Sequence, residues 1–285
     1  MRTFSTRIIL LLITLMLSAC SIIVSSATDK MAKNLSSAIL NNDDLATVKA
    51  GAPAYLLLLD SFIEGDPENT QTLISAANLY SAYANVFIKD KTRAKRLTQK
   101  ALDYSLRASC LEITASCQLE TMKFSQFENT IKSFEKHNID LLYTLGASWA
   151  SWIENRSDDW NAAAALSRIN TIMQHVINLD ENYKFGQAHL YLGVLNTLLP
   201  PALGGKPEIG KQHFDKAIAL SKGKNFMANV LYAEKYARLV FNQELHDKLL
   251  QKIINADPHI QNFTLTNVLA QNKAKILLTS GKDYF

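Results

Sequence analysis

Proline and glycine are missing from much of the middle of the 285-residue chain. No proline occurs between Pro67 and Pro200, and no glycine occurs between Gly65 and Gly146. The same span has no Asn-Gly or Asp-Gly pair, which is the common signal of a tight β-hairpin. Its apolar residues recur at steps of three and four, the period of a helix. Because both residues are poorly tolerated inside helices, their absence predicts long helices and excludes frequent tight turns.

Sequence motifs for catalysis, metal binding and phosphate binding are also missing. The six histidines form no His-Glu-x-x-His motif, and neither a Gly-x-x-x-x-Gly-Lys-Ser/Thr loop nor a Gly-x-Ser-x-Gly elbow occurs. After residue 19 no apolar run approaches the length of a membrane span. Without Arg2 and Arg7, 28 basic residues (30 − 2) face 26 acidic ones, which is no nucleic-acid signature. We therefore expect a binding protein that is not an enzyme and has no cofactor, metal or nucleic-acid partner.

The N-terminus has the layout of a secretory signal. Arg2 and Arg7 accompany an apolar run that begins at Ile8 and ends in Leu17-Ser18-Ala19-Cys20. At about 1.5 Å per residue the run is too short to span a bilayer. Leu-Ser-Ala-Cys resembles the bacterial lipobox, which implies that Cys20 is acylated and becomes the first residue of a lipoprotein. The alternative is an ordinary signal peptide that happens to contain a cysteine.

The residue after Cys20 bears on the location. Ser21 replaces the aspartate that usually retains lipoproteins in the inner membrane, so we expect attachment to the outer membrane, facing the periplasm. Two or more acyl chains anchor a protein stably. The chain then divides into a signal peptide (1–19), a lipidated cysteine with a tether and first helix (20–46), and a single helical domain (47–285).

The helical period and the breaks in it predict an all-α fold of about twelve helices in stacked antiparallel pairs. Thr92 is the expected cap of the fourth helix, and Asp43-Asp44 is expected to cap the second. The expected ranges are 27–40, 47–64, 69–88, 92–107, 117–136, 139–154, 160–178, 185–199, 208–220, 226–240, 244–255 and 265–279.

One pair of these helices resembles a tetratricopeptide unit. Leu192-Gly193 is followed by Phe214 and Ala217, as in the two helices of such a unit. The spacing is five residues too long, and the surplus falls in the loop 200–205. The pattern predicts a tetratricopeptide-like superhelical array with an insertion at this point.

The order of several motifs resembles the T component (TatT) of tetratricopeptide-associated TRAP transporters. The motifs are Gly51-Ala52-Pro53-Ala54-Tyr55, Ala76-Ala77-Asn78-Leu79-Tyr80, Gly146-Ala147-Ser148-Trp149, Gly186 to Gly193, Leu199 to Glu208, and Ala233 to Ala237. Lys206 departs from the pattern, where an acid is expected. The resemblance implies a periplasmic accessory lipoprotein with an all-helical fold. It also implies a homo-oligomer, such as a trimer, that associates with the solute-binding component of the transporter.

Two groups of residues are candidates for the functional site. The first is the loop with its flanking histidines, which either meets a ligand or partner or is a packed connection: His189, Pro200, Pro201, Leu203, Gly204, Gly205 and His213. The second is a set of aromatic residues that either line a ligand cleft or pack in the core: Tyr55, Tyr80, Tyr83, Trp149, Trp152 and Tyr191. The aromatic content favours a small apolar or amphipathic ligand.

Cys110 and Cys117 are the remaining cysteines. An oxidising compartment permits a disulfide between them, and two reduced core cysteines are the alternative.

Three functions remain open. The leading hypothesis is an accessory lipoprotein of a TRAP transporter that binds a small ligand, docks the solute-binding component, or does both. The second is a tetratricopeptide scaffold for outer-membrane or envelope assembly, and the third is an envelope hydrolase, which no motif supports.

Overall fold

The computed structural model describes residues 30–31, 34–156, 159, 162 and 164–285. Cys20 and the signal peptide lie outside the described residues, so the lipid anchor stays a prediction. The described part of the chain is 78% helical and contains no strand, which confirms the all-α prediction. Residues 34–40 are helical, within the predicted range 27–40. The α-helices that follow are α2 (Leu45–Gly65), α3 (Thr70–Phe87), α4 (Lys91–Glu112), α5 (Phe124–Lys132), α6 (Ile139–Glu154), α8 (Leu166–Leu179), α9 (Gln187–Asn196), α10 (Pro207–Leu220), α11 (Phe226–Leu231), α12 (Gln243–Ile254) and α13 (Thr264–Tyr284).

Side-chain caps fix where several helices begin. Asp44 accepts hydrogen bonds from the backbone N–H groups of Ala46 and Thr47, so the predicted cap of α2 is confirmed. The prediction for α4 was wrong, because Asp90 rather than Thr92 accepts the bond from the backbone N–H of Arg93. An aspartate is as good a cap as a threonine, and here it starts the helix one residue earlier.

Two predicted helices are not single α-helices in the structure, while α4 and α13 each extend five residues beyond their predicted ends at 107 and 279. The range 117–136 is not one helix: a 3-10 turn (Thr114–Ser116) precedes it and only α5 is α-helical within it. The range 226–240 begins as α11 and continues as a π-helical turn (Tyr232–Ala237). Periodicity does not detect the π-helical turn, because the apolar spacing of a single wide turn is close to that of an α-helix.

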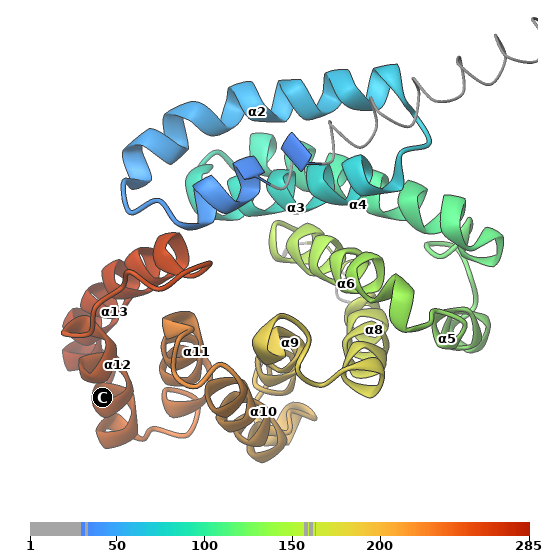
Figure 1. The fold of residues 1–285 in the computed structure, drawn as a ribbon. Helices are drawn as coiled ribbons and strands as arrows, with labels where there is room; N and C mark the ends of the chain where they lie inside the picture. The colour runs from blue at the N-terminus through green and yellow to red at the C-terminus, as the bar shows by residue number, and fades with distance from the viewer. Residues whose placement is uncertain (1–29, 32–33, 157–158, 160–161, 163) are drawn as a thin grey trace, which may run out of the picture.

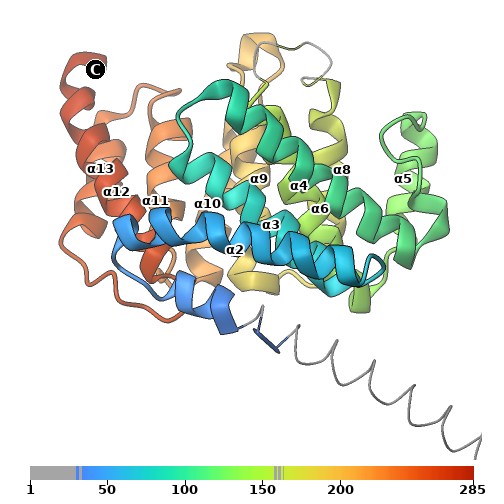
Figure 2. The same cartoon turned by 90° about the horizontal axis from the view of Figure 1, so that it is seen from above.

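Helices that follow each other in sequence pack as neighbours, and the chain curves into a ring (Figure 1). α3 packs against α4, α6 against α8 and α9 against α10, while α3 also packs against α6. α2 lies across the side formed by α3 and α4, and α12 and α13 lie at the opposite end of the chain. Seen from above, the segment before α2 lies beside the loop that precedes α13 (Figure 2). The first and last parts of the described chain therefore meet.

The apolar interior is divided into two cores. The first contains buried side chains from α2 to α9, with Leu59, Leu73, Leu102 and Ile172 among those that are fully buried. The second contains side chains from α9 to α13, such as Phe214, Leu250 and Ala274. α9 contributes to both, so it is the apolar connection between the two halves of the ring.

α2 is the one helix in the described part of the chain whose length and composition would allow it to cross a membrane. A core helix of a folded domain passes the same test. α2 buries Val48, Leu56, Leu59 and Ile63 and packs against α3, which accounts for its apolar composition.

Candidate functional site

The proline-glycine loop between α9 and α10 is held in one shape by its own backbone. The N–H groups of Leu203 and Gly205 both donate to the carbonyl of Pro200, at 2.9 and 3.1 Å. The N–H of Lys206 donates to the carbonyl of Asn196 at 2.9 Å and so closes the base of the loop. A 3-10 turn (Pro201–Leu203) forms the tip. These bonds and the fixed φ angles of two prolines make the loop stiff.

Glycine is required at the end of this loop. A Cβ atom on Gly205 would lie 1.7 Å from the carbonyl oxygen of Leu199, far inside van der Waals contact. Gly204 has φ +89°, in the left-handed region that side chains disfavour. Gly205 thus permits a close backbone approach within the loop, and Gly204 permits the left-handed conformation before it.

The outer face of this loop is apolar and exposed. Leu203 is 67% exposed, and Leu198, Leu199 and Ile209 also leave more than a third of their surface to solvent. Pro200 and Pro201 are exposed between them. We call these six residues the loop surface. A stiff apolar projection of this kind is typical of a contact site for another molecule.

His189 of α9 and His213 of α10, the two histidines that flank the loop in sequence, are in contact. Their Nδ1 atoms lie 2.8 Å apart. One ring must donate and the other accept, so the contact excludes two imidazolium ions. Burial and, to a smaller extent, the neighbouring His189 lower the pKa of His213 to about 4. Burial also lowers the pKa of His189, although Glu181 opposes the effect.

The helices of this pair approach closely at two glycines, Gly193 of α9 and Gly210 of α10; a Cβ atom on Gly210 would lie 2.6 Å from Cγ2 of Thr197. A Cβ atom on Gly193 would lie 2.8 Å from the ring of Phe214. The predicted Leu-Gly and Phe positions of the tetratricopeptide-like unit are therefore in direct contact. This packing of α9 on α10 places His189 opposite His213.

A second cluster, which the sequence did not predict, joins α6 to the start of α9. The hydroxyl of Tyr143 donates to Oε1 of Gln187 at 2.6 Å, and its ring makes edge contacts with Tyr183 and Tyr191. Lys184 lies 4.7 Å from the centre of the Tyr143 ring and donates to Asp140 at 2.8 Å. Burial raises the pKa of Tyr191 to about 12. Of these residues only Tyr191 was a predicted site residue.

This cluster is held by an unusual backbone. Lys184, Phe185 and Gly186 all have positive φ, at 46°, 59° and 74°. Left-handed residues other than glycine cost roughly 1–2 kcal/mol each. The Lys184–Asp140 ion pair and the aromatic contacts offset this cost. The glycine in the motif was the single sequence sign of the turn, and it did not show that two residues before it adopt the same conformation.

Tyr80 belongs to a different network. Asp60 of α2 accepts hydrogen bonds from the hydroxyls of Tyr80 and Tyr104, both at 2.7 Å, and from Lys100 at 2.6 Å. Burial raises the pKa of Asp60, but the three hydrogen bonds outweigh it and lower the pKa overall. The network attaches α2 to the α3–α4 pair, so the Tyr80 hydroxyl is already used within the fold.

The structure does not gather the other predicted aromatic residues into one cluster. Tyr55 and Tyr83 are buried in the first core, the latter against Phe87. Trp149 is buried as well and makes an edge contact with Phe127. Trp152 is half-buried, and its Nε1–H donates to Gln99 at 2.6 Å.

Cys110 and Cys117 are joined by a disulfide at the end of α4. Within the described residues, no group of three or more histidines, cysteines and carboxylates is arranged to hold a metal ion.

Comparison with known proteins identifies the chain from these features. The sequence model of one family, described as TRAP transporter T-component (TAtT), matches residues 41–285. The chain belongs to this family. The match includes the loop surface, the histidine pair and both cores. A comparison with curated individual proteins gave no match.

Membership of the T-component family indicates the general function of the protein. The protein is an accessory T component of a TRAP transporter and associates with other components of that system. The family is one of transporter accessory proteins, not of enzymes, and it belongs to the bacterial envelope.

Proposed function

We propose that this T component docks the solute-binding component of its transporter through the loop surface. The observation that carries the proposal is the exposure of Leu203 at the tip of a loop whose backbone is fixed by its own hydrogen bonds. Such a loop loses little conformational freedom on binding, which favours affinity. Most of the predicted aromatic residues are buried in the core, so the docking role is better supported than the binding of a small apolar or amphipathic ligand.

A pull-down and titration with the purified solute-binding component test this proposal. Leu203→Asp places a charge at the centre of the loop surface, and we expect binding to weaken about tenfold or more, as for a central interface residue. Leu57→Asp is the matched control, because Leu57 is 69% exposed on α2 and Leu203 is 67% exposed. If both variants bind the solute-binding component as tightly as the natural protein does, the proposal is wrong.

We propose further that Cys20 carries the lipid anchor at the outer membrane and that residues 47–285 form one tetratricopeptide-like domain that assembles as a homo-oligomer, such as a trimer. The consecutive pairing of α3 with α4, α6 with α8, and α9 with α10 supports the repeat arrangement. Mass spectrometry of the membrane-extracted protein tests the anchor, since Cys20→Ser should release an unacylated protein. Sedimentation of the extracted protein tests the oligomer, and a single monomeric species would contradict it.

A further inference from the structure

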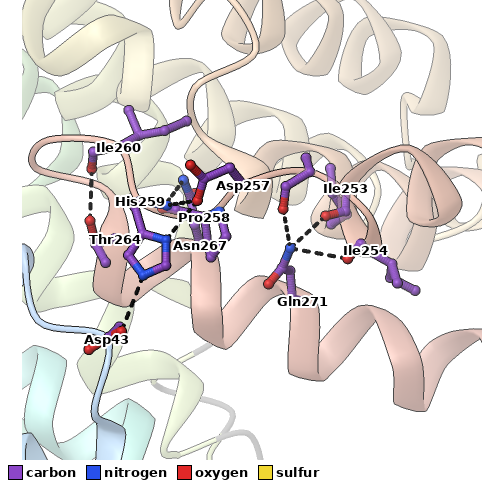
Figure 3. Close-up of polar contacts among 11 residues, drawn as sticks. Asp43, Ile253, Ile254, Asp257, Pro258, His259, Ile260, Thr264, Asn267 and Gln271 are labelled. Atoms are coloured by element: carbon purple, nitrogen blue, oxygen red, sulfur yellow. Dashed lines mark hydrogen bonds and ion pairs between the residues drawn. The ribbon is translucent and has the colours of Figure 1, made fainter.

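The first and last parts of the described chain are joined by a polar junction (Figure 3). Nε2 of His259, in the loop between α12 and α13, lies 3.2 Å from Oδ2 of Asp43, which precedes α2. Nearby, the backbone N–H of Asn262 donates to Oδ1 of Asn41 at 2.6 Å. His259 and Asp43 are 216 positions apart in sequence, and Asn262 and Asn41 are 221 positions apart. The junction closes the ring.

The loop that carries His259 is braced on its own half of the molecule. Asn267 is fully buried, and its side chain bonds the backbone N–H of Phe226 and the carbonyls of Lys224 and Pro258. The side-chain amide of Gln271 donates to the carbonyls of Ile253 and Ile254 at the end of α12 (Figure 3) and to that of Ala256 just beyond it. His259 is therefore held in place whether or not the N-terminal segment is attached.

The geometry of His259 requires a proton on each ring nitrogen. Its Nδ1 lies 2.7 Å from Oδ1 of Asp257, while its Nε2 faces Asp43. Ionised carboxylates only accept, and a neutral imidazole has one N–H, so both bonds form at once only in the imidazolium. The charged groups that act on His259 are these two carboxylates. Asp44, the next residue, is occupied in capping α2.

The two sides of this junction belong to different apolar cores. Leu35 and Ile39 pack against the first core, whereas Ile260 packs against the second. Among the described elements, α2 packs mainly on α3 and has no comparable packing with α12 or α13. On the other side of the ring, α9 holds the two cores together.

We propose that His259, Asp43 and Asp257 form a protonation-dependent latch that holds the N-terminal segment to the C-terminal loop. The latch is closed while His259 is an imidazolium and releases Asp43 when the ring loses its second proton. The hydrogen bonds from Asp257 and Asp43 raise the pKa of His259, so release occurs as pH rises through that raised value. Because the groups are exposed, salt weakens the latch.

Amide hydrogen exchange of the full chain measures the latch directly. The Asn262 N–H is protected by Asn41 only while the junction is closed. At low salt, after correction for intrinsic exchange, we expect its protection to fall roughly two- to fivefold from pH 5.5 to 8.5, the range of a surface ion pair. Energy transfer between dyes on Leu57→Cys and Ile276→Cys, exposed sites of α2 and α13, is expected to fall over the same range.

Three variants separate the latch from a general effect of pH. His259→Gln should show low protection at every pH, and His259→Arg should keep protection at every pH because its charge does not titrate. His137→Gln removes another exposed histidine that pairs with one carboxylate, Glu135, and should keep the natural profile. Unchanged protection between pH 5.5 and 8.5 in the natural chain, or the natural profile in His259→Gln, would overturn the proposal.

Discussion

The Nδ1 atom of His189 lies 2.8 Å from the Nδ1 atom of His213, across the α9–α10 pair that carries the loop surface. The pKa of each ring is lowered, chiefly by burial. A group with a depressed pKa in the folded state favours unfolding when it is protonated. The pair therefore stabilises the fold above the ordinary histidine pKa of about 6.5, and this contribution is lost as pH falls towards 4.

His213→Gln tests this dependence. The variant removes one group that takes up a proton on unfolding. Between pH 6.5 and 4, the slope of its free energy of unfolding against pH should therefore correspond to the uptake of up to about one proton fewer than in the natural protein. Denaturant titrations at a series of pH values measure that slope. An identical slope in the variant and the natural protein would show that His213 is not buried in neutral form.

Asp60→Ala should destabilise the protein strongly. The change leaves the hydroxyls of Tyr80 and Tyr104 and the ammonium of Lys100 without their common acceptor. We expect a loss of about 2–4 kcal/mol in the free energy of unfolding, since a partly buried charged acceptor is removed. Tyr80→Phe removes one of the three bonds and should cost about 1 kcal/mol. Chemical denaturation measures both, and equal effects of the two variants would contradict the network.

Two glycine substitutions test different properties: the one in the loop tests docking, and the one in α2 tests stability. Gly205→Ala forces the loop away from its observed shape, because the new Cβ would overlap the Leu199 carbonyl, and should weaken docking of the solute-binding component. Gly51→Ala, within α2 with no atom near its Cβ, should raise the free energy of unfolding by about 0.5–1 kcal/mol. Binding and denaturation assays on both variants check these outcomes, and normal docking by Gly205→Ala would count against a shape requirement in the loop.

Alkylation before reduction should leave Cys110 and Cys117 unmodified. Their disulfide closes a short loop at the end of α4, and in the chain-entropy model its removal costs on the order of 2–3 kcal/mol. Mass spectrometry with and without reductant distinguishes the states. Modification of both cysteines without reductant would mean that the natural protein holds them reduced.

The fold class could be predicted from the sequence because proline and glycine are excluded from helix interiors and are missing between Gly65 and Gly146. The expected range 69–88 lies within one residue of α3 at each end. Asn69 and Asp66-Pro67 mark its start clearly. The prediction of a helix over 117–136 was wrong because residues 117–123 form turns before α5, and no proline or glycine marks these turns in the sequence.

The candidate site could be predicted only in part. His189 and His213 lie on neighbouring helices of one repeat-like pair, so their encounter follows from local sequence order. The contact of Asp43 with His259 depends on the curvature of the whole ring, which adds up over all the helices between them. A short stretch of sequence does not show this accumulated curvature. The left-handed turn at Lys184 is likewise set by partners on α6, not by its own sequence.

α9 fixes how the two halves of the protein are oriented. Ala188 and Leu192 face the first core, while Leu190 faces the second. These positions lie around a single helix of 10 residues, so α9 cannot rotate about its axis without withdrawing side chains from one core and pressing others into the second. Both cores therefore constrain the orientation of this helix at once, and the position of the loop surface that follows it depends on the packing of both.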